Sequence, residues 1–189
     1  MSIPSVVMDL DGTLTVGNRV IDMFHVRPNA AKVVQLWKAK DYQVIFLTAR
    51  YKFLREMTWD WLEDNEFFYG LPSPLYMSQE ILLHDQAIEH YKFDKLIGLK
   101  SQGCNFLYAY GDSTTDFNAY NRVGIPVEHT FAMLRKEDRE QIAPFCQKGK
   151  YAACLDGFTD EHLLWIKSQP DVVKEVLECK SEENKTSEE

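Results

Sequence analysis

The chain has 189 residues and a formal net charge of −8 at pH 7. Its hydrophobic content of 45% is that of an ordinary globular protein, and no apolar run approaches the roughly 18 residues of a membrane-spanning helix. The negative charge argues against a broad nucleic-acid surface and against electrostatic attachment to anionic membranes, so an anionic ligand would need a local cation or metal.

This length is typical of one domain, and we expect a single domain over residues 1–178. The start of the chain has neither a basic segment nor the cleavage pattern of a signal peptide, so we expect a cytoplasmic protein. Residues 179–189 are charged and polar, which predicts a disordered acidic tail. The four cysteines fit neither a zinc site nor a disulfide framework, so we expect buried thiols.

The first half of the chain predicts two buried strands, each followed by a helix. A short apolar run predicts a strand over residues 3–8, and the continuous apolar centre of "YQVIFLTAR" predicts another over 42–50. Between them, residues 28–40 place apolar side chains at the spacing of one helix face: Ala30, Val33, Val34 and Trp37. The same stripe follows the second strand: Leu54, Met57, Trp61 and Leu62.

The second half continues this alternation. We expect a helix over 78–90, a short helix over 93–99, a buried strand over 105–110, a strand over 125–131 and a weaker strand over 151–155. Thr159 can cap a last helix whose inward residues are Leu163, Leu164 and Ile166. Strands that alternate with helices predict an α/β fold, in which a Rossmann-like, doubly wound parallel sheet carries helices on both faces.

Polar clusters follow three of the predicted strands. They are Asp9, Asp11, Gly12 and Thr13 after the first, Thr48, Ala49 and Arg50 at the end of the second, and Asp112 and Asp116 after the third. The carboxyl ends of parallel strands meet at one edge of a sheet, where ligands bind, so these acids should lie together. Grouped carboxylates repel one another unless a cation neutralises them, and Mg²⁺ prefers such oxygen ligands. The sequence therefore predicts a magnesium site.

Each cluster also has a plain structural interpretation. The Asp-Gly step at residues 11–12 is common in turns, Thr48 could be an ordinary strand-end hydroxyl, and "GDSTTD" could be a turn that caps a helix. The occurrence of all three, each after its own buried strand, favours the site. Gly12 would let the backbone turn sharply, and Thr13 with the following amides could donate hydrogen bonds to an anion.

With these motifs, residues 4 to 135 resemble a phosphatase of the haloacid dehalogenase superfamily. The resemblance implies that Asp9 is a nucleophile that forms an aspartyl phosphate, and that Asp11 protonates the leaving oxygen and later activates water. It implies that Thr48 binds the transferred phosphate. It also implies a Mg²⁺ site made by Asp112, Asp9 and the backbone carbonyl of Asp11, with Asp116 holding these ligands in place.

The same resemblance requires a lysine between the second and third clusters, and the chain offers Lys92, Lys95 and Lys100. We choose Lys92, because it precedes the inward residues Leu96 and Leu99, and keep Lys95 as the alternative. The residues expected to contact substrate phosphate are Gly12, Thr13, Ala49, Arg50 and Lys92.

No cap domain fits between the clusters, so we expect an open site that admits a bulky phosphorylated substrate. Within the superfamily the chain is most similar to the catalytic domain of lipin-type (LNS2) phosphatidate phosphatases. The resemblance is carried by "LTAR", "GLPSPLYMS", "YKFDKL" and "YGDSTTDFNAYNRVGIP". It implies a Mg²⁺-dependent phosphatase acting on phosphatidate, while a phosphotyrosine- or phosphoserine-bearing protein would suit an open site equally well. A non-catalytic phosphatidate-binding module is the alternative function.

Overall fold

The computed structural model describes residues 2–17, 19, 21–68, 73–134, 140, 142–143, 146 and 151–172. Its strands are β1 (Ile3–Met8), β2 (Gln43–Tyr51), β3 (Leu75–Ser78), β4 (Cys104–Gly111), β5 (Thr130–Met133) and β6 (Ala153–Leu155). They form one sheet in the order β3-β2-β1-β4-β5-β6, and every neighbouring pair is parallel.

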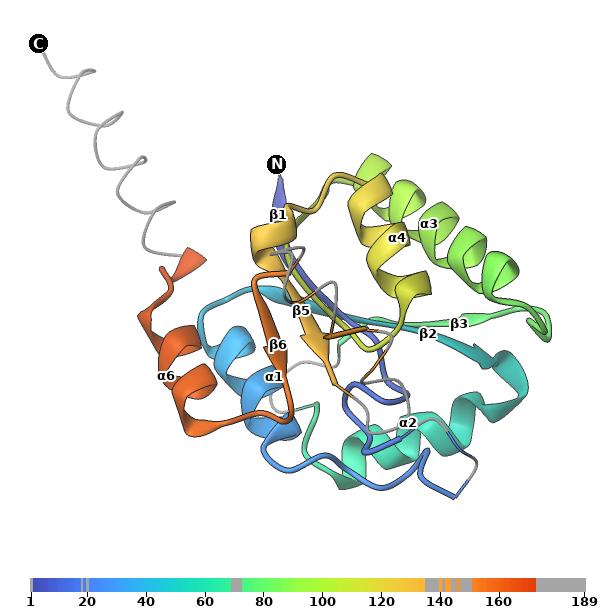
Figure 1. Cartoon of the computed structure of the whole chain (residues 1–189), viewed down its shortest axis with the longest axis horizontal. Helices are drawn as coiled ribbons and strands as arrows, with labels where there is room; N and C mark the ends of the chain where they lie inside the picture. The colour runs from blue at the N-terminus through green and yellow to red at the C-terminus, as the bar shows by residue number, and fades with distance from the viewer. Residues whose placement is uncertain are drawn as a thin grey trace, which may run out of the picture.

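Helices cover both faces of this sheet (Figure 1). They are α1 (Ala30–Ala39), α2 (Arg55–Asp64), α3 (Asp85–Ser101), α4 (Thr114–Arg122) and α6 (Asp160–Ser168), with short 3₁₀ turns η1 (Lys52–Leu54) and η2 (Val127–His129). Strand β1 shows how the core divides, because Val6 and Met8 pack with α1, α2 and α6, whereas Val7 packs with α3 and α4. The predicted doubly wound α/β fold is confirmed.

Several helix predictions are confirmed in detail. The α1 face predicted from spacing is fully buried: Ala30, Val33, Val34 and Trp37. At the start of α6, the Thr159 hydroxyl accepts a hydrogen bond from the His162 amide, which satisfies one of the free amides of the first turn. In the same helix Leu163 and Ile166 are buried, but Leu164 is 63% exposed. The prediction for Leu164 is wrong because it lies about 100° around the helix from Leu163.

A buried polar chain ties α1, β4 and α6 together. The Trp37 indole donates to the Tyr110 hydroxyl at 3.1 Å, and that hydroxyl lies 2.9 Å from His162 Nε2. The His162 ring also stacks on Trp165. Burial lowers the pKa of His162 to about 4, because the imidazolium would lose its hydration there. His162 is therefore a neutral core residue at physiological pH.

The region after α2 differs from the prediction. The helix expected over 78–90 starts too early: β3 occupies Leu75–Ser78, and the helix, α3, begins only at Asp85. The short helix expected over 93–99 is the second half of α3, which is one continuous helix of 17 residues. Strand β3 is only four residues long and has no β-branched residue, so it lacks the usual sequence signal of a strand.

Smaller corrections concern the far edge of the sheet. The strand expected over 125–131 lies at Thr130–Met133, after the turn η2, and the weaker strand expected over 151–155 is β6. The expectation of buried thiols is wrong for two of the cysteines, since Cys146 and Cys154 form a disulfide with their Cα atoms 6.0 Å apart. Cys104 is a buried free thiol.

The tail predicted over residues 179–189 lies outside the described part of the chain. Within that part, none of the helices combines the length and the apolar character needed to cross a bilayer. The described residues between β1 and β2, and between β2 and β4, hold loops and elements of the layered core rather than a cap domain. The expected capless architecture is thus observed for the described residues.

Candidate active site

The candidate site lies where the sheet changes direction of winding. Strand β1 pairs with β2 on one side and with β4 on the other, and crevices at such positions are the usual ligand sites of open parallel sheets. Asp9 directly follows β1, and Asp112 directly follows β4. The Asp9 amide donates to the Tyr110 carbonyl at 3.1 Å, which extends the β1–β4 ladder to the site.

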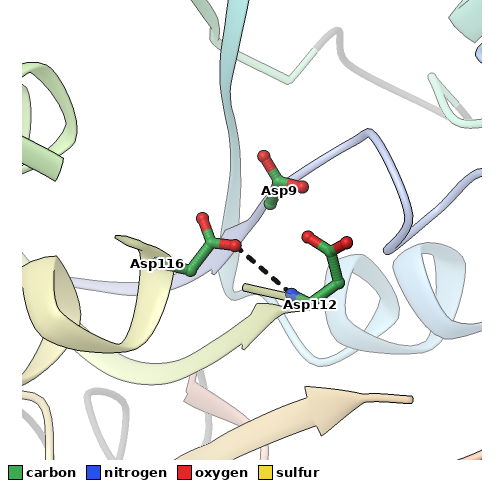
Figure 2. A group of neighbouring side chains, drawn as sticks. All are labelled: Asp9, Asp112 and Asp116. Carbon is green, nitrogen blue, oxygen red and sulfur yellow. Dashed lines mark hydrogen bonds between the residues drawn. The ribbon is translucent and has the colours of Figure 1, made fainter. Parts of the chain in front are cut away.

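Three buried carboxylates converge at this point (Figure 2). One carboxylate oxygen from each of Asp9, Asp112 and Asp116 lies within 4.8 Å of the other two. The Lys92 side chain enters the same group from α3: its Nζ lies 2.7 Å from Asp9 Oδ1 and also pairs with Asp116. We call these four residues the acidic cluster.

The acidic cluster has more negative than positive groups. Burial raises the pKa of Asp9 to about 7, Lys92 opposes this rise, and the neighbouring carboxylates of Asp116 and Asp11 add to it. Burial alone would lower the pKa of Lys92, but Asp116 and Asp9 raise it above its usual range. Three carboxylates against one ammonium leave an excess that a divalent cation would neutralise, and oxygen donors suit Mg²⁺. The donor set therefore fits this metal.

Asp116 is held in place by the start of α4. Its Oδ2 accepts hydrogen bonds from the Ser113 hydroxyl at 2.8 Å, the Ser113 amide at 3.2 Å and the Asp112 amide at 3.3 Å. The residue before these, Gly111, leaves no room for a side chain, since a Cβ there would lie 2.6 Å from the Cβ of Asp116. Gly111 is thus a site residue that sequence reasoning missed, although "YGDS" contains it.

The turn after Asp9 is closed by its own hydrogen bonds. Gly12 has a φ of 76°, which favours glycine, and its amide donates to the Thr15 hydroxyl at 3.0 Å. The Thr13 hydroxyl donates to Asp9 Oδ2 at 3.3 Å. Arg27, also missed from the sequence, is buried and donates to the Gly12 carbonyl at 2.7 Å and to the Thr13 carbonyl at 2.9 Å. Hydrogen bonds within the turn and from the Arg27 side chain therefore fix the conformation of the turn.

The carboxylate of Asp11 lies apart from the acidic cluster and pairs with β2. Arg50 contacts it through Nε and Nη2, with the shortest distance 2.7 Å to Oδ1, and the Thr48 hydroxyl donates to Oδ2 at 3.2 Å. We call this contact the Asp11–Arg50 pair. Ala49 is half-buried at the same strand end. The phosphate contacts predicted for Thr48, Ala49 and Arg50 stay predictions.

The structure separates the three lysines considered from the sequence. Lys92 lies in the acidic cluster, whereas the Lys95 ammonium lies over the Tyr76 ring at 5.3 Å and Lys100 donates to the Val123 carbonyl. Lys92 shares a helix face with the buried residues Leu96 and Leu99, at the i, i+4 and i+7 spacing. That spacing is the sequence signal that distinguishes Lys92 from Lys95.

The comparison with protein families gives one match: residues 6–134 match the family described as "PITM 1-3, LNS2 domain". This range contains every residue of the acidic cluster and of the Asp11–Arg50 pair. The predicted likeness to LNS2 domains is confirmed. A comparison with curated proteins gave no match.

Solved structures share the fold at low identity. A chain of the Pnkp1/Rnl/Hen1 RNA repair complex covers 71% of this chain and 43% of its own, with a TM-score of 0.53 and 19% identity. DsGPDH of Dunaliella salina covers 86% of this chain and 28% of its own, with a TM-score of 0.53 and 15% identity. The class C acid phosphatase from Bacillus anthracis covers 95% of this chain and 79% of its own, with a TM-score of 0.51 and 15% identity. This chain thus spans less than half of the first two proteins.

Proposed function

From the premise that this chain belongs to the LNS2 domain family, we propose that it is a Mg²⁺-dependent phosphatase that hydrolyses phosphate monoesters through an aspartyl-phosphate intermediate. The single observation that carries the proposal is the acidic cluster, in which Asp9 lies at the end of a central strand beside Lys92 and two further carboxylates. Buried carboxylates this close to one another are costly unless cations neutralise them.

In this proposal each residue has a definite task. Asp9 Oδ attacks phosphorus while the bond to the leaving oxygen breaks, and Asp11 gives that oxygen its proton. Asp11 then takes a proton from the water that attacks phosphorus, while the bond between phosphorus and Asp9 breaks and phosphate is released. Asp9, Asp112, Asp116 and the Asp11 carbonyl would hold Mg²⁺, which supplies charge neutralisation on the phosphoryl oxygens. The residues proposed to contact phosphate are Gly12, Thr13, Thr48, Ala49 and Lys92.

The size of the barrier explains why so many groups are needed. Enzymes accelerate phosphate-monoester hydrolysis by up to ~10²¹, which corresponds to roughly 29 kcal/mol, whereas orientation of the reactants supplies about 7–11 kcal/mol. The remainder must come from charge stabilisation and from division of the reaction by a covalent intermediate. The acidic cluster offers both a nucleophile, Asp9, and groups for charge stabilisation: Lys92 and the carboxylates that would hold a metal.

A bulky or amphiphilic substrate is supported by the apolar side chains beside the site. Six of the nine large hydrophobic residues exposed in the described structure lie after the carboxyl ends of β1, β2 and β3: Val16, Ile21, Phe53, Met57, Ile81 and Leu83. This is the edge of the sheet that carries Asp9. A phosphatidate-type lipid would bring its phosphate to the site and its acyl chains to these side chains. A phosphoprotein would also have access.

A non-catalytic phosphatidate-binding module is the second candidate. In such a module the same metal and lysine would bind the phosphate without attack by Asp9. The retention of both Asp9 and Asp11 favours the enzyme, since binding alone requires neither a nucleophile nor an acid.

A substrate screen separates these functions. Phosphate release would be measured from short-chain phosphatidate, a phosphotyrosine peptide and a phosphoserine peptide, with and without Mg²⁺, for the wild type and Asp9→Asn. Liposome flotation with phosphatidate would be run on the same proteins. Release that needs both Mg²⁺ and Asp9 supports the phosphatase. Flotation without release from any of the three substrates would overturn it in favour of the binding module.

A further inference from the structure

Arg50 has all of its contacts inside the protein. Its side chain is buried near the end of β2, where Nε and Nη2 contact the Asp11 carboxylate and Nη2 also donates to the Met23 carbonyl. Nη1 donates to the Thr58 hydroxyl at 3.2 Å. The guanidinium thus joins three separate parts of the chain: the turn after β1, the loop before α1, and α2.

Aromatic rings flank the same guanidinium. Its central carbon lies 5.1 Å from the centre of the Phe24 ring and 5.6 Å from that of Trp61. The Trp61 indole donates to the Phe24 carbonyl at 2.7 Å, so the loop is attached to α2 independently of Arg50. The two rings also contact each other, with centres 6.4 Å apart, so they approach the guanidinium from adjacent directions. A guanidinium with these contacts has little freedom to turn toward a ligand, because turning would lose the ring contacts and the hydrogen bonds together.

We infer that Arg50 is a positioning residue for Asp11 and does not bind substrate phosphate, an inference that rests on the proposed function. The guanidinium fork contacts both carboxylate oxygens, and Thr48 donates to one of them. Asp11 lies in a turn, and its side chain is about one quarter exposed. The hydrogen bonds recorded to its carboxylate from described residues come from Arg50 and Thr48. Arg50 therefore sets where the proposed acid and base stands relative to phosphorus.

Kinetic constants distinguish positioning from phosphate binding. We expect Arg50→Lys and Arg50→Met to lower kcat by about 100-fold, the size expected when a catalytic group is displaced by about 1 Å. KM and the inhibition constant of inorganic phosphate should change less than about twofold, because the guanidinium does not touch the phosphate. An unchanged kcat with both constants raised tenfold or more would overturn the inference.

Two further variants guard against a simple folding defect. Thr58→Val removes one hydrogen bond to the guanidinium and leaves the Asp11–Arg50 pair in place, so we expect a loss in kcat of only a few-fold. Arg122→Met is the matched control, since Arg122 also pairs with an acid, Glu89, and lies over an aromatic ring, Phe93, but on the far end of α4. It should leave kcat unchanged, and an equal loss there would contradict a specific role for Arg50.

A double-mutant cycle tests the coupling directly. In an Asp11→Asn background, Arg50→Met should lower kcat by less than about threefold further, because its partner is already gone. A full additional 100-fold loss would overturn the inference. The same cycle measured by urea unfolding should show at least about tenfold coupling in the unfolding constant. If the wild type releases no phosphate, the proposed function fails, while this unfolding cycle still decides whether Arg50 holds Asp11.

Discussion

The acidic cluster and the Asp11–Arg50 pair lie at the ends of neighbouring strands but differ in charge balance. The acidic cluster sets three carboxylates against one lysine, whereas the Asp11–Arg50 pair matches one carboxylate with one guanidinium. The four groups of the acidic cluster carry an excess of negative charge, whereas the two groups of the pair balance each other. The difference suggests that metal and phosphate are captured at the acidic cluster, and that the pair supplies fixed geometry.

The largest expected effect comes from removing the nucleophile. Asp9→Asn should lower phosphate release by roughly 10⁴-fold or more, as loss of a covalent nucleophile does in other enzymes. Single-turnover and steady-state assays with Mg²⁺ would measure it. Asp60→Asn, the same substitution at an exposed position of α2, should leave the rate unchanged. Near-normal activity of Asp9→Asn would contradict the proposal that the acidic cluster contains the nucleophile.

The next effect concerns the only lysine in the acidic cluster. Lys92→Met should destabilise the fold by about 3–5 kcal/mol without metal, because it leaves buried carboxylates uncompensated. Saturating Mg²⁺ should restore part of this loss. Urea unfolding with and without Mg²⁺ measures both effects, and Lys95→Met on the same helix is the control. If Mg²⁺ stabilised neither the variant nor the wild type, the idea of an incomplete charge balance would fail.

His162 provides a pH-dependent contribution to stability that lies outside both the acidic cluster and the Asp11–Arg50 pair. Its folded pKa of about 4 lies below the ordinary value of 6.5, so the unfolded chain binds more protons between these pH values. The stability contributed by neutral His162 is complete above pH 6.5 and falls by about 3 kcal/mol as the pH drops to 4. His162→Gln should flatten this part of the unfolding profile. An unchanged slope would place the acid sensitivity elsewhere.

The smallest effect tests the close packing behind Asp116. Gly111→Ala should cost about 2 kcal/mol, because its Cβ would collide with Asp116, and should weaken Mg²⁺ binding by about tenfold. Gly98→Ala in α3 is the matched control, since nothing lies within 4 Å of its Cβ and alanine favours a helix by about 0.5–1 kcal/mol. Calorimetric titration with Mg²⁺ measures the binding. Equal affinities in both variants would contradict the role given to Gly111.

Sequence reasoning succeeded where one strong signal determined the structure. Strands β1, β2 and β4 are largely apolar and end in acids or hydroxyls, so their common edge follows from the parallel-sheet rule. The same rule predicts that Asp9 and Asp112 lie together, as they do in the structure. It failed for β3, which is too short to show a pattern.

The contacts of Arg50 could not be predicted in the same way. Its partners include the Met23 carbonyl and the Phe24 ring, which lie in a loop without periodic sequence. Backbone carbonyls leave no trace in the sequence, so the sequence alone favours phosphate binding for a strand-end arginine beside a predicted phosphate site. The Cys146–Cys154 disulfide was missed for a related reason, because pairing depends on where the segments meet.

The pairing of β1 with β4 also determines the spacing between Asp9 and Asp112. Neighbouring strands are spaced roughly 4.7–4.9 Å apart, and Asp9 and Asp112 leave two such neighbours at nearly the same level of the ladder. Backbone hydrogen bonding between the two strands therefore sets the spacing of these two residues, and the loop sequences do not. Loops around the crevice can diverge and change which molecules enter, while the spacing offered to an ion stays constant.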